Sequence, residues 1–224
     1  MKDNRYTLRV LARLLAYPDA EMRGSLHLLP AVLDDEAALS ASRRAELKAL
    51  VQDLLRSDAI EAEARYVETF DRGRATSLHL FEHVHGDSRE RGPAMVDLAQ
   101  TYAAAGLHLA PEELPDHLGV VLEFASTQPP AIAAEFLGEV AHILKAVFSA
   151  LLKRESPYAS VLAAVLELAG ETAQAVPFTA DEPVDDSWQE PEPFDGCSSR
   201  GQSRPGQPQP IHIVRKTSSS GAQA

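Results

Sequence analysis

Histidine, carboxylate and arginine side chains gather in one stretch of the sequence, YVETFDRGRATSLHLFEHVHGDSRERGPAMVDL, which begins at Tyr66. His79 and His83 are four residues apart, so a helix would place both imidazoles on one face with Glu82 beside them. Two imidazoles at this spacing are one way in which a helix binds zinc. A metal-dependent hydrolase that uses His79, His83 and a carboxylate is therefore one hypothesis.

The order of these residues does not favour metal chemistry. The segment reads HLFEHVH rather than HExxH, so Glu82 is not where a zinc peptidase needs its general base. The one cysteine, Cys197, lies in a segment predicted to be disordered, which is a poor setting for a catalytic thiol. We therefore interpret His79, Glu82 and His83 as a polar recognition face, and we predict no catalytic residues and no metal site.

Five arginines surround this stretch: Arg65, Arg72, Arg74, Arg89 and Arg91. Guanidinium groups suit phosphate, so these side chains could bind an anionic cofactor group. They could instead form ion pairs with nearby carboxylates of the same chain, and this is the interpretation that we favour. Arg91, one turn after Asp87, is a candidate for a half-buried, ion-paired arginine. Arg89 and Arg91 remain candidates for either role.

Composition narrows the class of protein. The 224 residues are 45% hydrophobic, enough for one domain of ordinary size plus a tail. The net charge of −12 disfavours nucleic acid and anionic membranes and favours basic partners. The charged amino terminus is not typical of a signal peptide, no apolar run is long enough to span a membrane, and a lone cysteine fits a reducing compartment. We expect a cytoplasmic protein.

Helical periodicity dominates the sequence, and no alternating strand pattern competes with it. The predicted helices cover residues 4–16, 19–29, 40–55, 58–70, 77–85, 87–105, 116–128, 131–153 and 156–168. We expect Asp116 to cap the helix that follows it, and the very apolar 131–153 helix to be central. The predicted class is all-α.

Apolar spacing within these helices predicts the core. In the helix over 77–85, one apolar arc lies opposite the polar recognition face and contains Leu78, Leu80, Phe81 and Val84. In the helix over 58–70, the possible core positions are Ile60, Ala64, Val67 and Phe70.

The composition changes after Val176. Residues 177–224 hold seven of the fifteen prolines and are otherwise rich in Gly, Ser, Gln and acid. Such a segment buries too little apolar area to offset its ordering entropy. We predict a helical domain over 1–176 and a disordered tail over 177–224, in which only QPQPIHIVRK could dock as a short motif.

The central string SLHLFEHVHGDSRERGPAMVDL, with YVETFD before it and ELPDHL…LEF after it, resembles the nitrate reductase delta-subunit family of NarJ-type molybdenum cofactor assembly chaperones. The resemblance includes the amino-terminal LRVLARLLAYPD and reaches about residue 175. Gly119 is a departure, because the family pattern is expected to favour proline there. The resemblance implies the globular helical fold of the redox-enzyme maturation chaperones.

The resemblance also implies a function. Such a chaperone would bind the amino-terminal segment of the apo catalytic (alpha) subunit of a respiratory nitrate reductase. It would keep that subunit off the membrane, assist insertion of the molybdenum–guanine-dinucleotide cofactor, bind no cofactor permanently and insert in no membrane itself. An acidic helical protein with an apolar groove suits a short basic amphipathic peptide. We expect the helices over 77–85 and 87–105 to border that groove, and the predicted peptide-binding residues are Phe70, Asp71, His79, Phe81, Glu82, His83, Asp87, Tyr102, Asp116 and His117.

Overall fold

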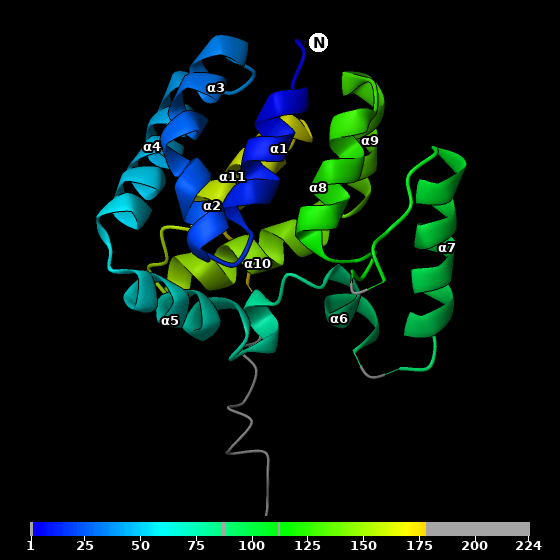
Figure 1. Cartoon of the computed structure of the whole chain (residues 1–224). Helices are drawn as coiled ribbons and strands as arrows, with labels where there is room; N and C mark the ends of the chain where they lie inside the picture. Colours follow the sequence, from blue (N-terminus) through cyan, green and yellow to red (C-terminus); the bar gives the residue numbers. More distant parts are fainter. Residues whose placement is uncertain (1, 87, 112, 178–224) are drawn as a thin grey trace, which may run out of the picture. The chain divides into compact units, whose positions relative to one another are not determined.

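The computed structural model describes residues 2–86, 88–111 and 113–177. Within these residues the regular structure is helical, without a strand, which confirms the all-α class. No helix in this part of the chain is both long and apolar enough to cross a membrane. The elements shown in Figure 1, with two short 3₁₀ turns η1 and η2, are α1 (Arg5–Leu14), α2 (Ala20–Ser25), η1 (Leu26–Leu28), α3 (Leu29–Glu36), α4 (Ala41–Arg56), α5 (Ala59–Phe70), η2 (Arg74–Thr76), α6 (Leu80–His85), α7 (Arg91–Ala104), α8 (Leu118–Thr127), α9 (Pro130–Glu139), α10 (Ala141–Lys153) and α11 (Ala159–Leu168).

Helix α11 is the centre of the core. It contacts α1, α4, α9 and α10, and residues 161–166 have no exposed surface. A helix surrounded on every side needs apolar side chains at nearly every position, and ASVLAAVLEL provides them. In the segment expected to be central, residues 131–153, the second half packs on α11 and also contacts η2, α6 and α9, so it lies in the core beside α11. The first half buries Ala133 and Leu137 and is more exposed.

The single helix predicted over 131–153 is two helices, α9 and α10, that meet at Val140. Val140 has φ −98° and ψ 7°, so the regular hydrogen-bond ladder stops there. The two helices run in different directions in Figure 1. The apolar periodicity continues through the junction because both helices bury one side, so the sequence pattern alone did not reveal the break.

Capping side chains fix the beginnings of the amino-terminal helices. Asp19 accepts the backbone N–H of Met22 at 2.7 Å, and Ser40 accepts that of Arg43 at 3.3 Å, so these two residues are the N-caps of α2 and α4. Pro30 lies in the first turn of α3, a position that tolerates proline, and the chain reaches it through η1.

The segment before α6 departs from the prediction. The helix begins at Leu80 rather than at Ser77, because residues 77–79 are extended and pair with another segment. Leu78 and Leu80 are buried, as the apolar arc predicts, whereas Val84 of that arc is 52% exposed.

Helix α7 lies at the edge of the bundle (Figure 1), and Tyr102 is its one fully buried residue among those described. The helix ends before Gly106, as predicted, and Gly106 has φ +82°. The N–H of Leu107 then donates to the carbonyl of Tyr102 at 2.9 Å, which closes the helix end in a Schellman motif. The chain leaves α7 at this turn to form one wall of the groove described below.

Candidate functional site

Two extended segments join α6 to the start of α8. The N–H of Leu80 donates to the carbonyl of Asp116 at 3.0 Å, and the N–H of Leu118 donates to the carbonyl of Leu78 at 2.8 Å. These two bonds form an isolated antiparallel bridge between His79 and His117. Side chains that are distant in sequence are thereby held against each other.

Asp116 is the centre of the resulting polar network. Its side chain is fully buried, and it accepts the N–H of Phe81 at 3.2 Å. The Nδ1 atom of His79 lies 3.3 Å from one carboxylate oxygen, and a guanidinium nitrogen of Arg91 lies 3.6 Å from the other. Asp116 therefore caps α6. The prediction that it caps the helix that follows it, α8, is wrong.

Arg91 links this carboxylate to a second one. It pairs with Glu82 at 3.3 Å, and Glu82 in turn accepts the hydroxyl of Ser77. Arg91 is half-buried and ion-paired, as predicted, with Glu82 and Asp116 as its described partners. Asp87, the partner suggested by the sequence, lies outside the described residues.

The three side chains interpreted as an outward recognition face are turned toward partners within the chain. His79 meets Asp116, Glu82 meets Ser77, and Nε2 of His83 lies 2.9 Å from the carbonyl oxygen of Ser77. Among the described residues no group of three or more metal-ligating side chains comes together. The face is half-buried and rigid, so it can present a shaped polar edge but has no open ligand set.

The two histidines of the bridge have opposite protonation preferences. The hydrogen bond to Asp116 raises the pKa of His79 against the opposing effect of burial. Burial lowers the pKa of His117, and the neighbouring charge of His79 lowers it further. Nδ1 of His117 accepts the N–H of Gly119 at 3.2 Å, which requires the neutral ring and makes His117 the N-cap of α8.

The Asp116 carboxylate stays ionised in this network. Burial alone would raise its pKa, but the hydrogen bonds from His79 and from the N–H of Phe81, with the charges of His79 and Arg91, lower the pKa below its usual value. A buried charge held by three partners stabilises one arrangement of α6, α7 and α8 and destabilises others.

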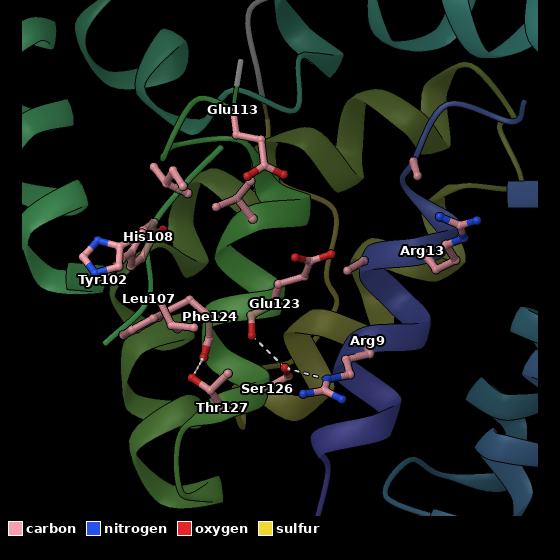
Figure 2. Close-up of a pocket in the computed structure, with 14 residues that line it drawn as sticks. Arg9, Arg13, Tyr102, Leu107, His108, Glu113, Glu123, Phe124, Ser126 and Thr127 are labelled. Atoms are coloured by element: carbon pink, nitrogen blue, oxygen red, sulfur yellow. Dashed lines mark hydrogen bonds between the residues drawn. The ribbon is translucent and has the colours of Figure 1, made fainter. Parts of the chain in front are cut away.

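A groove is lined by Tyr102, which lies between this groove and the polar network around Asp116. Its cavity volume is about 480 Å³, within the range of binding sites for small ligands and side chains. Tyr102 separates groove from network, since its ring packs on Phe124 with a centroid distance of 4.6 Å and its hydroxyl donates to the carbonyl of Pro115 at 2.9 Å. The lining, drawn in Figure 2, comes from α1 and the turn after it, from α7 and the segment after it, and from α8: Arg9, Ala12, Arg13, Ala16, Tyr102, Leu107, His108, Leu109, Glu113, Val120, Glu123, Phe124, Ser126 and Thr127.

The groove combines an apolar floor with charged edges. Figure 2 shows Arg9 and Arg13 on α1, with Glu123 on α8 and Glu113 on the segment that follows α7. Partial burial raises the pKa of Glu123, and the charge of Glu113 raises it further, while the two arginines oppose this. Because two carboxylates repel each other across the groove, a cation placed between them is favoured.

The predicted site residues fall into different places. Phe70 is 5% exposed and packs on Tyr66 and Tyr158, so it is a core residue in this structure. Tyr102 alone among the described predicted residues lines the groove. Asp71 and Arg89 are exposed, and Phe81 is half-buried against His85 at a ring-centroid distance of 5.7 Å. The network contains the remaining described members: His79, Glu82, His83, Arg91, Asp116 and His117.

Sequence reasoning missed most of the groove. Arg9 and Arg13 are four residues apart on α1, on the flank of the stripe that packs in the core, and this spacing was the available signal. Glu123 and Phe124 belong to the LEF string of the family resemblance, but the sequence did not place them at a groove, because only the packing of α8 on α1 brings them there.

The described residues form an all-α fold, with no cluster of three or more metal-ligating side chains among them. A crystal structure of a redox enzyme maturation protein from Archaeoglobus fulgidus matches 75% of this chain and 94% of that chain with a TM-score of 0.52 and 20% identity, which supports the fold. A model of the family described as nitrate reductase delta subunit matches residues 36–164. The chain belongs to the nitrate reductase delta subunit family.

Sequence relatives agree with this assignment. The chain is 41% identical over 185 residues to the nitrate reductase molybdenum cofactor assembly chaperone NarJ of Escherichia coli K12, covering 81% of this chain and 78% of the relative. It is 40% identical over 153 residues to the nitrate reductase-like protein NarX of Mycobacterium tuberculosis, covering 68% of this chain and 22% of that protein. The first name describes an assembly chaperone rather than a catalyst, which agrees with the prediction that this protein is not an enzyme.

Proposed function

We propose that this protein is the dedicated assembly chaperone of a respiratory nitrate reductase. It binds the amino-terminal segment of the apo catalytic subunit in the cytoplasm and keeps that subunit from premature membrane attachment. Insertion of the molybdenum–guanine-dinucleotide cofactor takes place in this state, and the chaperone then leaves the finished enzyme. The family and the name of the Escherichia coli relative support the role in cofactor assembly.

The observation that carries peptide binding is the groove beside Tyr102. Its floor is apolar, and Glu113 and Glu123 both line it, so a short amphipathic segment with an apolar face and a basic residue suits it. Arg9 and Arg13 on α1 bond to Ser126 and Glu21, and their remaining N–H groups can donate hydrogen bonds to a carboxylate or carbonyl of the same segment. The groove therefore sets both the position and the direction of the bound peptide.

The polar network has a supporting role in this proposal. Asp116 and Arg91 hold the chain between α7 and α8, which forms the groove wall through Leu107, His108, Leu109 and Glu113. His79, Glu82 and His83 form a half-buried edge that contacts the peptide where it leaves the groove. Arg89, exposed beside this edge in sequence, is the candidate for cofactor handover.

Calorimetric titration of a synthetic peptide tests the proposal. The peptide comprises about the first fifteen residues of the cognate catalytic subunit, the length of a helix-in-groove ligand. We expect Glu113→Gln/Glu123→Gln to weaken binding about tenfold, since two partly desolvated charge contacts are lost. A variant with the same charge loss on α9, Glu135→Gln/Glu139→Gln, controls for the overall charge of the protein.

A second variant, His79→Ala/Glu82→Ala/His83→Ala, separates the network edge from the groove, with circular dichroism to confirm folding. Weaker binding in this variant assigns the edge to the peptide site, and unchanged binding assigns these residues to structure or cofactor handover. Equal affinity of the groove variant and the α9 control would move the peptide site elsewhere. A wild-type protein that does not bind the peptide contradicts the proposed function.

A further inference from the structure

Helix α5 turns an apolar seam toward the surface. Ile60, Ala64 and Val67 follow each other at intervals of four and three residues, the spacing of side chains that face a partner helix. Ile60 is 78% exposed, more than any other large hydrophobic side chain in the described part of the chain. The core positions expected from the sequence were these three and Phe70, and of the four Phe70 alone is buried.

Tyr17 widens this seam at the end of α1. Its side chain is 44% exposed, and its ring packs edge-on against Tyr66 of α5 at a centroid distance of 5.6 Å. Its hydroxyl donates to Glu63 at 3.1 Å, which fixes the ring beside the seam. The apolar surface therefore comes from two elements and is wider than a single helix face.

Carboxylates flank the seam on both sides. Glu61 and Glu68 lie on one flank of the seam and Glu63 lies on the other. In paired helices, the charges at such flanking positions determine which partner helix binds. Among the described residues, Arg72 offsets one of these charges through an exposed pair with Glu68 at 3.0 Å. Arg65 faces a different direction and pairs with Asp53 of α4 at 2.8 Å.

The helix dipole of α5 favours Glu61, which lies in the first turn, but does not favour Glu68. Glu68 and Asp71 lie three residues apart at the carboxyl-terminal end of the helix, where the helix dipole is already negative. Like charges at this spacing repel each other. The placement costs folding stability, and a basic partner would offset that cost.

We propose that this face of α5, with Tyr17, docks an amphipathic helix of a partner protein whose apolar seam is flanked by lysine and arginine. Charge complementarity selects this occupant. A second copy of the chain would set the glutamates of one seam against those of the other. The face shares no residue with the groove beside Tyr102, so it goes beyond the proposed peptide site and gives the chaperone a second contact.

Fluorescence anisotropy with designed peptides tests this docking on the full-length protein. The probe is a labelled helical peptide with leucine at seam positions and lysine at flanking positions, and its matched control carries glutamate at the flanks. We expect the lysine peptide alone to bind, and Ile60→Ser to weaken its binding about tenfold. We expect Glu61→Gln/Glu68→Gln to weaken it about three- to tenfold, while Glu135→Gln/Glu139→Gln and Ile132→Ser on α9 leave it within twofold.

The α9 variants distinguish docking on α5 from a general attraction to an acidic protein. Each of them removes the same kind of side chain, two glutamates or one isoleucine, from a different surface. Equal binding by the α5 and α9 variants would overturn the proposal. Displacement of the probe by the groove peptide would also overturn it, since the two sites would then be one. A wild-type dimer in sedimentation analysis that Ile60→Ser dissociates would assign the face to a second copy instead.

Discussion

The carboxylate of Asp116 accepts the backbone N–H of Phe81 at 3.2 Å, so an acidic residue directly before α8 caps α6 instead. His117 takes over the cap of α8. Because Asp116 precedes α8 in the sequence but caps α6, its buried carboxylate fixes the position of these two helices relative to each other. It also makes the wall of the groove depend on a buried charge that does not itself line the groove.

Removal of Asp116 is expected to be costly. Asp116→Ala leaves the half-buried Arg91 without one of its two carboxylates and leaves the N–H of Phe81 without an acceptor. We expect a loss of about 3 kcal/mol in the free energy of unfolding, measured by urea denaturation, and a smaller loss for Asp116→Asn. Asp97→Ala, on the exposed side of α7, is the control and should remain within about 0.5 kcal/mol of wild type. Similar values for both alanine variants would contradict the role of Asp116.

The two bridge histidines predict opposite pH dependences of stability. The pKa of His79 is raised above 6.5 in the folded protein, so its contribution is complete below pH 6.5 and is lost as the pH rises through the folded value. The pKa of His117 is lowered below 6.5, so its contribution is present above pH 6.5 and is lost as the pH falls. The stability advantage of wild type over His79→Gln should therefore shrink from pH 6 to pH 8. The advantage over His117→Asn should grow from pH 5 to pH 7 in the same urea titrations, and parallel curves would refute this assignment.

Two glycines should respond with opposite signs. Gly119→Pro removes the N–H that Nδ1 of His117 accepts, and we expect a loss of about 1 kcal/mol, as for other helix caps. Gly138→Ala adds a methyl group with nothing within 4 Å in α9, and we expect a gain of about 0.5–1 kcal/mol. Thermal unfolding of the two variants beside wild type measures both changes. A stabilising Gly119→Pro would show that the His117 cap does not contribute.

Truncation tests the predicted domain boundary. The tail over 177–224 lies almost entirely outside the described residues, while the segment before it is tied to α10 by a bond from the N–H of Val176 to Ser149 at 2.8 Å and by an ion pair of Glu171 with Lys145 at 2.6 Å. A chain ending at residue 180 should therefore unfold at the urea midpoint of the full protein. A chain ending at residue 169 should lose about 1–2 kcal/mol. An aggregated 1–180 fragment would show that the tail stabilises the core.

Sequence periodicity predicted most of the helical segments, because most helices bury one face and the apolar spacing records it. It missed α3, which begins at the end of the predicted 19–29 helix and continues to Glu36. It could not predict that α9 and α10 are separate, since the stripe continues through Val140. It also placed Ile60 in the core by the same rule, although that side chain is exposed. An apolar stripe predicts that a helix face is buried, but the exposure of Ile60 shows that this chain does not itself cover every such face.

The candidate site was predicted in part. The density of polar residues around His79 and Arg91 indicated the segment that forms most of the polar network. Arg91 is half-buried and ion-paired, as predicted. The partner Asp116 is far away in sequence, and local spacing therefore suggested Asp87 and a cap on α8. The groove escaped prediction because α1 and α8 form it together, and no pattern within either helix records that contact.

Helix α11 fills the middle of the core, yet the ribosome makes it after all the helices that surround it. Until α11 is made, the apolar residues of α1, α4, α9 and α10 that pack on it have no such cover. They can then contact other chains. Most helical proteins fold quickly because their contacts are local in sequence. Here the core also needs contacts between α1 and α11, which are separated by most of the described sequence. The chain therefore passes through an aggregation-prone stage before α11 is made.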